Sequence, residues 1–507
     1  MVSTIHSCVL VGLTGYTATV ETDLGRGLPR FDVVGLPDAS VKESRDRVHA
    51  AIKNCGYTYP VSRITVNLAP GELRKEGPVY DLPIMVGILV ASGQLPAPPE
   101  DSAMIGELSL EGKVRGANGV LCMAMHLKKA GIERFFVPED NAAEAAMVRG
   151  LTVYPVRDVQ QLASHLKGET LITPAPHTEY KPQVPDSLDF ADVIGQESAK
   201  RALTIAAAGG HHALLIGPPG SGKSMLAKRL PSILPDLSEQ EALECTGIHS
   251  VAGMLPRGDA MVRSRPVRSP HHSISVNGLA GGGTHPRPGE ISLAHNGVLF
   301  LDELPEFHRD ALETLRQPLE DGCVTISRVS ASCTYPSRFM MICAMNPCRC
   351  GYYGHPTKEC ICTERQRTEY RKRISGPLLD RIDIHVTVAP LPYEELEKRP
   401  KGESSAAIRA KINAARKLQA ERYAPYGITT NSQLTPALMD KFCRPDEKGQ
   451  LLLKAAYDKL GLSARGYDKL LKLARTIADL EGAGEIKAEH LTEAAGYRFL
   501  DKRNILE

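Results

Sequence analysis

Residues 217–224 read GPPGSGKS, a glycine-rich run between an apolar segment and a segment of good helix formers. Residues 213–216 (ALLI) suit a buried parallel strand, and residues 225–230 (MLAKRL) favour a helix. A strand, a glycine loop and a helix in this order cradle phosphates with backbone N–H groups and with the helix N-terminus. The sequence therefore predicts a nucleotide-binding α/β domain, in which Lys223 reaches the β- and γ-phosphates and Ser224 holds Mg²⁺. The residues predicted to surround the phosphates are Gly217, Pro218, Pro219, Gly220, Ser221, Gly222, Lys223 and Ser224.

The length and composition set limits on the rest of the chain. Its 507 residues are enough for about three domains. A formal net charge of +2 neither demands nor excludes nucleic acid, so a basic surface has to be local. Trp is absent and aromatic residues make up 5%, which disfavours a base-stacking platform for single strands.

The sequence also predicts where the protein resides. It does not open with a basic segment followed by an apolar core, so we expect no signal peptide. The longest strongly apolar run, residues 82–91, is too short to cross a bilayer. We therefore expect a cytoplasmic protein without a membrane partner. In that reducing compartment, clustered cysteines indicate a metal more often than a disulfide.

The chain divides into regions of different composition. The first region alternates expected helices and strands, with Ile64, Val66 and Leu68 on one face of a half-buried strand. A helix is expected to begin at a capping box formed by Ser40 and Glu43 and to end near Gly56. Later in this region we expect helices over residues 123–129 and from residue 141, and strands over 134–137 and 151–154. The predicted organisation is an α/β domain over 1–168, a proline-rich linker over 169–187, the nucleotide domain over 188–392 and a helical part over 393–507.

Two further apolar runs end in polar residues that suit ATP hydrolysis. Residues 297–301 predict a buried strand that ends at Asp302 and Glu303. We assign Asp302 to Mg²⁺ and Glu303 to the general base, although a cap at the strand end is the alternative for Asp302. Residues 339–345 predict another strand, and Asn346 after it can position water near the γ-phosphate or can begin a turn before Pro347.

Five runs together carry a resemblance to a known family: GPPGSGKS, GEISLAHNGVLFLDE (289–303), AMNP (344–347), SGPLLDRIDI (375–384) and LSARGYDKLLKLARTIADL (462–480). They are similar to the magnesium-chelatase-like branch of the AAA+ ATPases, and nearly the whole chain resembles the ComM/YifB family. The resemblance implies an α/β fold: an AAA+ P-loop ATPase core with a helical C-terminal lid, preceded by a Lon-protease-like α/β domain.

The resemblance also implies roles for two arginines. Arg381 matches the arginine finger, which enters the site of a neighbouring subunit, and Arg465 matches sensor 2, which touches nucleotide in cis or in trans. Ordinary surface ion pairing is the alternative for both. If Arg381 acts in trans, one subunit lacks a complete site, so we expect a ring, as a homo-hexamer.

A stretch without acidic residues precedes the strand of Asp302. Residues 260–289 contain no Asp or Glu but several arginines, and the glycines 281–283 are expected to make part of the stretch mobile. A flexible cationic loop suits a phosphate backbone, whereas packing between subunits is the alternative. A second candidate is a hairpin expected over residues 325–337. The predicted DNA contacts are Arg263, Arg265, Arg268, Arg287 and Arg328.

Four of the twelve cysteines fall within residues 348–362. Two close pairs around a loop can bind one tetrahedral Zn²⁺, which with four thiolates is structural and not catalytic. His355 is an alternative ligand, and four reduced thiols without metal are the other interpretation. The predicted ligands are Cys348, Cys350, Cys360 and Cys362.

The first region resembles the Lon protease fold in residues 75–81 and 106–114 but lacks its catalytic dyad. Val79 stands where the resemblance implies the serine, and Leu121 where it implies the lysine. Without a nucleophile or its base, peptide hydrolysis has no chemistry to proceed by. We expect a scaffold or a DNA- or partner-binding domain, with Arg74, Lys75 and Asp81 as surface contacts or simply as charges at strand ends.

The resulting prediction is an ATP- and Mg²⁺-dependent ring motor. By its resemblance to the ComM/YifB family it is a helicase that promotes branch migration in recombination and in the uptake of transforming DNA. Its expected partners are single-stranded or branched DNA and recombination proteins. The alternative is a chelatase-type or chaperone-like remodelling ATPase that acts on a protein or a metal-insertion partner.

Overall fold

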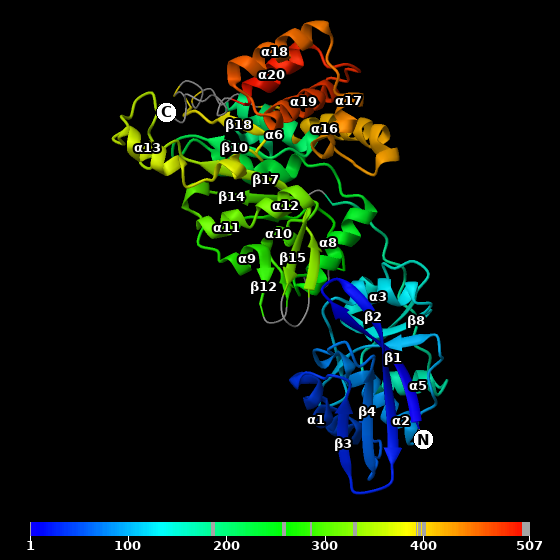
Figure 1. The fold of residues 1–507 in the computed structure, drawn as a ribbon. Helices are drawn as coiled ribbons and strands as arrows, with labels where there is room; N and C mark the ends of the chain where they lie inside the picture. Colours follow the sequence, from blue (N-terminus) through cyan, green and yellow to red (C-terminus); the bar gives the residue numbers. More distant parts are fainter. Residues whose placement is uncertain are drawn as a thin grey trace. The chain divides into compact units, whose positions relative to one another are not determined.

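The computed structural model describes residues 2–183, 188–255, 260–283, 286–327, 332–391 and 402–498, together with 393 and 397. The chain forms two compact units (Figure 1). Each unit is built from separate stretches of sequence. The first unit comprises Met1–Lys181, Ala242–Val262 and Thr325–Tyr335, and the second comprises Pro182–Glu241, Arg263–Val324 and Pro336–Glu507. The first unit therefore includes two stretches from inside the predicted nucleotide domain.

A seven-stranded mixed sheet forms the centre of the first unit, in the order β3-β4-β2-β1-β5-β8-β9. The strands β1 and β2 form a long antiparallel hairpin, and β2 also pairs antiparallel with β4. Ile64, Val66 and Leu68 are buried on one face of β4, which confirms the predicted alternation. The strands are β1 Val2–Val11, β2 Thr14–Gly25, β3 Arg30–Val34, β4 Arg63–Ala69, β5 Ser102–Met104, β8 Arg134–Pro138 and β9 Thr152–Val156, beside a ribbon of β6 Glu107–Leu108 and β7 Val114–Arg115.

Helices pack on this sheet because they present apolar side chains to it. The apolar run predicted from residue 82 becomes α2, which is buried almost all around. The first helix begins one residue before the predicted cap: the Asp38 carboxylate accepts from the Val41 N–H at 2.8 Å, so the capping box at Ser40 is wrong. The helices are α1 Ala39–Asn54, α2 Asp81–Ala91, α3 Val120–Lys129, α4 Ala142–Ala145 and α5 Val159–Leu166, with short 3₁₀ turns at Pro78–Tyr80 and Glu139–Asn141.

The two additional stretches of the first unit are bound to it by specific contacts. The end of α8 (Glu239–Val251) brings Ser250 to Glu144, and the Ser250 hydroxyl donates to that carboxylate. The same hydroxyl accepts from the Gly119 N–H at 2.8 Å. The second stretch belongs to the hairpin of β15 (Cys323–Ser327) and β16 (Ser332–Pro336), which was expected over residues 325–337. Its Cys333 lies against Gly12, at the turn between β1 and β2.

A five-stranded parallel sheet forms the centre of the second unit, in the order β11-β14-β17-β10-β18. The predicted strands over 213–216, 297–301 and 339–345 are β10, β14 and β17. Parallel strands end at one edge of a sheet, so the residues that follow these three strands come together there. The bounds are β10 Ala213–Ile216, β11 Val267–Arg268, β14 Val298–Leu301, β17 Met340–Met345 and β18 Ile384–Thr387.

Short helices and one ribbon surround this sheet. Two of the three glycines over 281–283 pair with residues 287 and 288, so that part of the loop is a ribbon and not a free segment. The elements are α6 Glu197–Gly209, α7 Lys223–Arg229, α9 Val276–Ala280, β12 Gly281–Gly282, β13 Arg287–Pro288, α10 Glu290–Leu293, α11 Arg309–Glu313, α12 Arg316–Asp321, α13 Glu364–Arg371 and α14 Gly376–Leu379, with 3₁₀ turns at Phe190–Asp192, Leu230–Ile233 and Leu304–Glu306.

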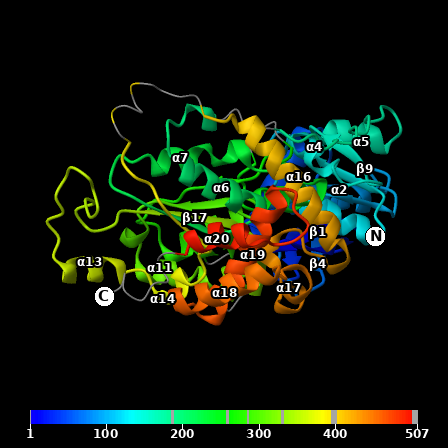
Figure 2. The ribbon, with the colours of Figure 1, turned by 90° about the horizontal axis from the view of Figure 1, so that it is seen from above.

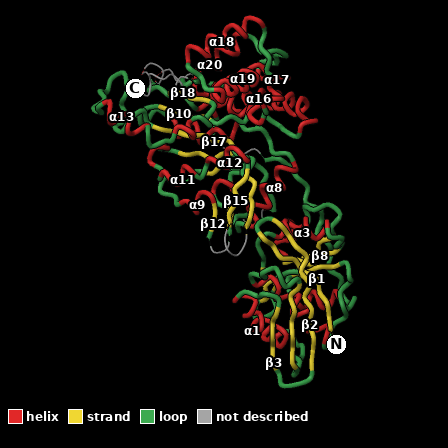
Figure 3. Tube along the Cα trace, viewed as in Figure 1, coloured by secondary structure: helices red, strands yellow, loops and turns green. Residues whose placement is uncertain are grey.

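The C-terminal part of the second unit is helical, as predicted (Figures 2 and 3). The helices α16 and α19 pack against α6, and α19 is buried on all sides over residues 473–479. The helices are α16 Ser405–Tyr423, α17 Pro436–Phe442, α18 Glu447–Leu460, α19 Ala464–Leu480 and α20 Ala488–Gly496, with 3₁₀ turns at Ala424–Tyr426 and Asn431–Gln433. Among all described helices, none combines the length and the apolar character that crossing a bilayer requires.

Candidate active site

The glycine-rich loop connects β10 to α7, as the motif predicts. A side chain at position 217 would put its Cβ 2.2 Å from the Val388 carbonyl oxygen, so only glycine fits there. Gly222, just before α7, has φ 95°, a left-handed conformation that glycine adopts without strain. These two glycines let the loop turn tightly above the sheet and direct the N-terminus of α7 into it.

Lys223 lies inside this loop. Its ammonium donates to the carbonyl oxygens of Gly217 at 2.7 Å and Pro218 at 2.9 Å, and to Oδ1 of Asn346 at 3.2 Å. Burial lowers the pKa of Lys223, and the charges of Asp302 and Glu303 oppose that shift. The contact with Asn346 joins the loop to the end of β17, where the sequence placed a residue for the γ-phosphate.

Ser224 and Asp302 meet although they are far apart in sequence. The Ser224 hydroxyl donates to Oδ2 of Asp302 at 2.6 Å, and Asp302 follows directly after β14. A hydroxyl and a carboxylate oxygen beside a phosphate loop are hard oxygen ligands of the kind that Mg²⁺ takes. This pair therefore fits the predicted magnesium site.

Glu303 has an unusual backbone. Its φ of 53° is in the left-handed region, which a residue with a side chain adopts at a cost. Its Oε2 lies 3.4 Å from Nδ1 of His272, and its side chain is half exposed. The sequence placed His272 in the stretch without acidic residues and gave no signal that it would meet the predicted base.

The two predicted arginines, Arg381 and Arg465, share one ion-pair partner. Arg381 follows α14, and its guanidinium donates to Oε1 of Glu320 on α12. Arg465, in the first turn of α19, lies 3.4 Å from the same oxygen. Glu320 is thus an ion-pair partner of both arginines within their own chain, and the sequence did not single it out.

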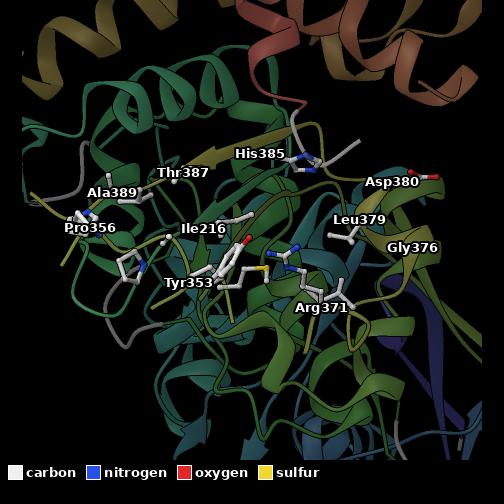
Figure 4. A pocket seen from close by; sticks show the side chains of 18 of the residues that line it. Ile216, Tyr353, Pro356, Arg371, Gly376, Leu379, Asp380, His385, Thr387 and Ala389 are labelled. Atoms are coloured by element: carbon white, nitrogen blue, oxygen red, sulfur yellow. The ribbon is translucent and has the colours of Figure 1, made fainter. Parts of the chain in front are cut away.

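A cavity of about 580 Å³ adjoins the phosphate loop (Figure 4). The ring of Tyr353 and the guanidinium of Arg371 both line it, and the guanidinium carbon lies 5.7 Å from the centre of the ring. It brings together parts of the second unit that no motif links: the loop at Gly217 and Pro218, the cysteine segment at Tyr353, β18 at His385 and the start of the lid at Ser463. The cysteine segment also touches the loop directly, because a Cβ at Gly351 would lie 2.6 Å from Cδ of Pro219.

The four predicted cysteines form one cluster. Their Sγ atoms all lie within 4.8 Å of one another, and the Cys348–Cys350, Cys348–Cys360 and Cys350–Cys360 separations are 3.4, 3.7 and 3.6 Å. Tetrahedral zinc with Zn–S bonds of about 2.3 Å requires S···S distances of about 3.8 Å, whereas a disulfide requires about 2.0 Å. The geometry therefore fits a metal and not a disulfide. His355 is not part of the cluster, because neither of its ring nitrogens lies within 4.8 Å of all four Sγ atoms. Its Nδ1 instead accepts from the N–H groups of Thr357 and Lys358.

Two of these thiols differ in acidity. Burial raises the pKa of Cys348 to about 12. At Cys350 burial acts in the same direction, but the Tyr352 N–H and the neighbouring thiols outweigh it and lower the pKa to about 6.

The structure divides the predicted DNA-contact arginines. Arg265 donates to Glu241 at 3.1 Å and to the Asn296 carbonyl oxygen at 2.7 Å, and its side chain is 14% exposed. Arg268 forms a two-pronged pair with Glu290, at 2.6 and 2.8 Å. Arg287 on β13 is exposed, Arg263 is half-buried, and Arg328 lies outside the described residues.

The places of the absent protease dyad hold packed apolar side chains. Leu121 is fully buried in α3, and its N–H donates to Glu144 at 2.8 Å. Val79 packs against the core of the first unit. Lys75 and Asp81 are fully buried, so of the two interpretations that the sequence left open, surface contact is wrong for both. Asp81 accepts from Arg47 at 2.6 Å, and Lys75 donates to the Pro70 carbonyl oxygen. Arg74 is half exposed.

Comparison with known proteins gives matches along nearly the whole chain. Three family descriptions match: "Magnesium chelatase, subunit ChlI" over residues 189–396, "Subunit ChlI of Mg-chelatase" over 20–141 and "Magnesium chelatase, subunit ChlI C-terminal" over 402–498. The chain is 43% identical over 510 residues to the "Uncharacterized protein YifB" of Escherichia coli K12, which covers 99% of this chain and 97% of that protein. It is 42% identical over 502 residues to the "Competence protein ComM" of Haemophilus influenzae, covering 98% and 97%. The "Magnesium-chelatase 38 kDa subunit" of Rhodobacter capsulatus is 24% identical over 330 residues, covering 60% of this chain and 85% of that subunit.

Proposed function

The chain belongs to the ComM/YifB family of magnesium-chelatase-like AAA+ ATPases, and from that premise we propose that it is a DNA motor that promotes branch migration in recombination. The family implies ATP and Mg²⁺ as its cofactors. The main observation in support of an ATP-driven motor is a cluster of contacts at one edge of the parallel sheet: Lys223 contacts Asn346, and Ser224 contacts Asp302. The name of the Haemophilus relative, a competence protein, supports DNA as the substrate and recombination proteins as partners.

Each residue of the site has its own role in the proposed hydrolysis of ATP. Lys223 and the loop N–H groups bind the β- and γ-phosphates, and Asn346 beside Lys223 orients the γ-phosphate and the attacking water. Ser224 and Asp302 would hold Mg²⁺, which would neutralise charge on the phosphates when bound. Glu303 accepts the proton of the attacking water through its carboxylate.

Arg381 and Arg465 serve the site of the next subunit. In that arrangement each subunit contributes its phosphate loop to one interface and its arginines to the other, so the interfaces close into a ring, which we propose to be a hexamer. A ring with one site at each interface couples hydrolysis in one subunit to the position of its neighbour.

We propose that Arg263 and Arg287 contact the phosphate backbone of DNA, because Arg265 and Arg268 are already paired with carboxylates. The double variant Arg263→Ala/Arg287→Ala is expected to make the negative slope of log binding constant against log salt concentration shallower by about two. The reason is that each arginine neutralises one phosphate. Fluorescence anisotropy with labelled branched DNA at several salt concentrations measures this slope. ATP hydrolysis without DNA stays at the wild-type rate.

The exposed pair Arg30 and Arg63 provides the matched control, because Arg30→Ala/Arg63→Ala removes two positive charges from the first unit. That control keeps the wild-type salt slope. If Arg263→Ala/Arg287→Ala instead leaves DNA binding intact and weakens assembly, this region packs subunit against subunit.

Zinc at the four cysteines is the second part of the proposal. Purified full-length protein is expected to contain about one zinc per subunit, and Cys350→Ser/Cys360→Ser to contain almost none, because two ligands of a closed site are lost. Elemental analysis by mass spectrometry measures the zinc content, and a thermal melt reports the loss of stability. Cys55→Ser, at a half-buried cysteine in the first unit, is the control that keeps the metal. Wild-type protein without zinc would mean four reduced thiols.

A chelatase-type or chaperone-like ATPase is the competing function, supported by the match to the Rhodobacter subunit. One experiment separates the two: ATP hydrolysis by the full chain is measured with branched DNA, single-stranded DNA, an unfolded protein or a porphyrin added. A DNA motor is stimulated by DNA and moves a branch point in a labelled junction. Stimulation by protein or porphyrin alone, without DNA binding at low salt, would rule the DNA motor out.

A further inference from the structure

Glu320 forms ion pairs with both arginines that, in the proposed mechanism, act in the site of another subunit. Its Oε1 accepts from Nη2 of Arg381 and lies 3.4 Å from Nη2 of Arg465. The three residues come from α12, from the turn after α14 and from the first turn of α19, so the contact joins the ATPase core to the lid.

The position of Arg381 is well defined. Its side chain is 10% exposed, and Nη1 donates to the Pro377 carbonyl oxygen at 2.6 Å. Its Nε is buried and has no hydrogen-bond partner among the described residues. Arg465, in contrast, is 62% exposed, and Glu320 is 49% exposed, so the face of the cluster opposite Arg381 is open to a partner.

The charges of this cluster do not balance. Two guanidinium groups converge on one carboxylate, which leaves one positive charge in excess and brings two like charges close together. Planar guanidinium groups bind phosphate oxygens with paired hydrogen bonds, and a phosphate carries more negative charge than a carboxylate. A terminal phosphate is therefore a better match for this pair of arginines than Glu320 is.

We propose that Glu320 is a positioning residue that stands in for the phosphate: it holds Arg381 and Arg465 together in the free subunit and gives them up to the nucleotide of the neighbouring subunit. The proposal rests on the proposed function, in which both arginines act in trans. Because one carboxylate holds both, a neighbour's nucleotide releases the core arginine and the lid arginine in one event. Glu320 thereby opposes assembly until nucleotide is present.

The test is Glu320→Gln in the full chain, which keeps the size of the side chain and removes its charge. Without the competing ion pair, the subunit concentration for half-maximal ATP hydrolysis is expected to fall about twofold to fivefold, the range that a partly exposed ion pair contributes. The rate at saturating subunit concentration does not fall. Analytical ultracentrifugation with ATP shows the same shift in assembly.

Two further variants make the test specific. Glu313→Gln removes the negative charge of another partly exposed ion pair, in which Glu313 lies 3.0 Å from Arg316 on the neighbouring helix. This variant is expected to leave the subunit concentration for half-maximal ATP hydrolysis unchanged. In an Arg381→Ala background, Glu320→Gln shifts assembly by a much smaller factor, because the main partner is already gone.

The proposal is overturned if Glu320→Gln leaves the subunit concentration for half-maximal ATP hydrolysis unchanged. It is also overturned if that concentration stays at the wild-type value while the rate at saturating subunit concentration falls. Failure of the proposed function gives a different result: wild-type protein that does not hydrolyse ATP, or Arg381→Ala that hydrolyses it normally. Since the Glu320 side chain is half exposed, its substitution leaves the fold intact, which a thermal melt checks.

Discussion

Lys223→Ala is expected to reduce ATP turnover by at least about a thousandfold, because it removes the positive charge that stabilises the phosphates in the transition state. Lys223 is 8% exposed, and its ammonium is within hydrogen-bonding distance of the loop and of Asn346, so no other cation of the loop can replace it. Release of inorganic phosphate measures turnover, and titration with a fluorescent ADP analogue measures the loss of nucleotide affinity.

A nearby lysine provides the control for this variant. Lys228 lies on the same helix α7 but is exposed, so Lys228→Ala keeps wild-type turnover. Circular dichroism checks that Lys223→Ala remains folded. A folded Lys223→Ala variant with wild-type turnover would mean that hydrolysis takes place at another site.

Arg381→Ala is expected to leave nucleotide binding intact and to slow hydrolysis by about 10³–10⁵, the contribution of an arginine finger in related enzymes. In the proposed ring the loss arises at the interface: the guanidinium pairs with Glu320 in its own chain, and the proposal is that it reaches the phosphate bound by the next subunit. Arg316→Ala, at an exposed arginine on α12, is the control that keeps the rate.

Mixing the two inactive variants distinguishes action in trans from action in cis. In a mixed ring, an Arg381→Ala subunit supplies an intact phosphate loop, and a Lys223→Ala neighbour supplies the arginine. At equal amounts about a quarter of the interfaces are then complete, so a corresponding share of activity returns. If the two variants co-assemble and remain inactive, Arg381 acts within its own subunit.

The sequence predicted those parts of the site that follow strand ends. Asp302 and Asn346 each come directly after an apolar run, and parallel strands deliver their carboxyl ends to one edge. For that reason the contacts of Ser224 with Asp302 and of Lys223 with Asn346 could be anticipated across 78 and 123 residues. The cysteine cluster could be anticipated as well, because its four members are close in sequence.

Contacts that depend on packing could not be predicted. His272 and Glu320 are ordinary polar residues in loops and short helices, and nothing in the local pattern says which carboxylate or arginine they will meet. The pairing of Arg265 and Arg268 could not be predicted either, because their carboxylates lie outside the stretch without acidic residues: Glu290 directly follows it, and Glu241 lies 24 residues before Arg265. The buried positions of Lys75 and Asp81 also depend on tertiary contacts.

The composition of the first unit has a consequence for how the protein is made. A ribosome releases residues 1–181 long before residues 242–262 and 325–335, and domains generally fold as their chain emerges. Until then the buried Glu144 lacks the Ser250 hydroxyl, and the Gly119 N–H lacks its acceptor. The first unit therefore completes its contacts only after residues 242–262 and 325–335 have been translated. An expression fragment that stops at residue 181 lacks these two stretches of its own fold.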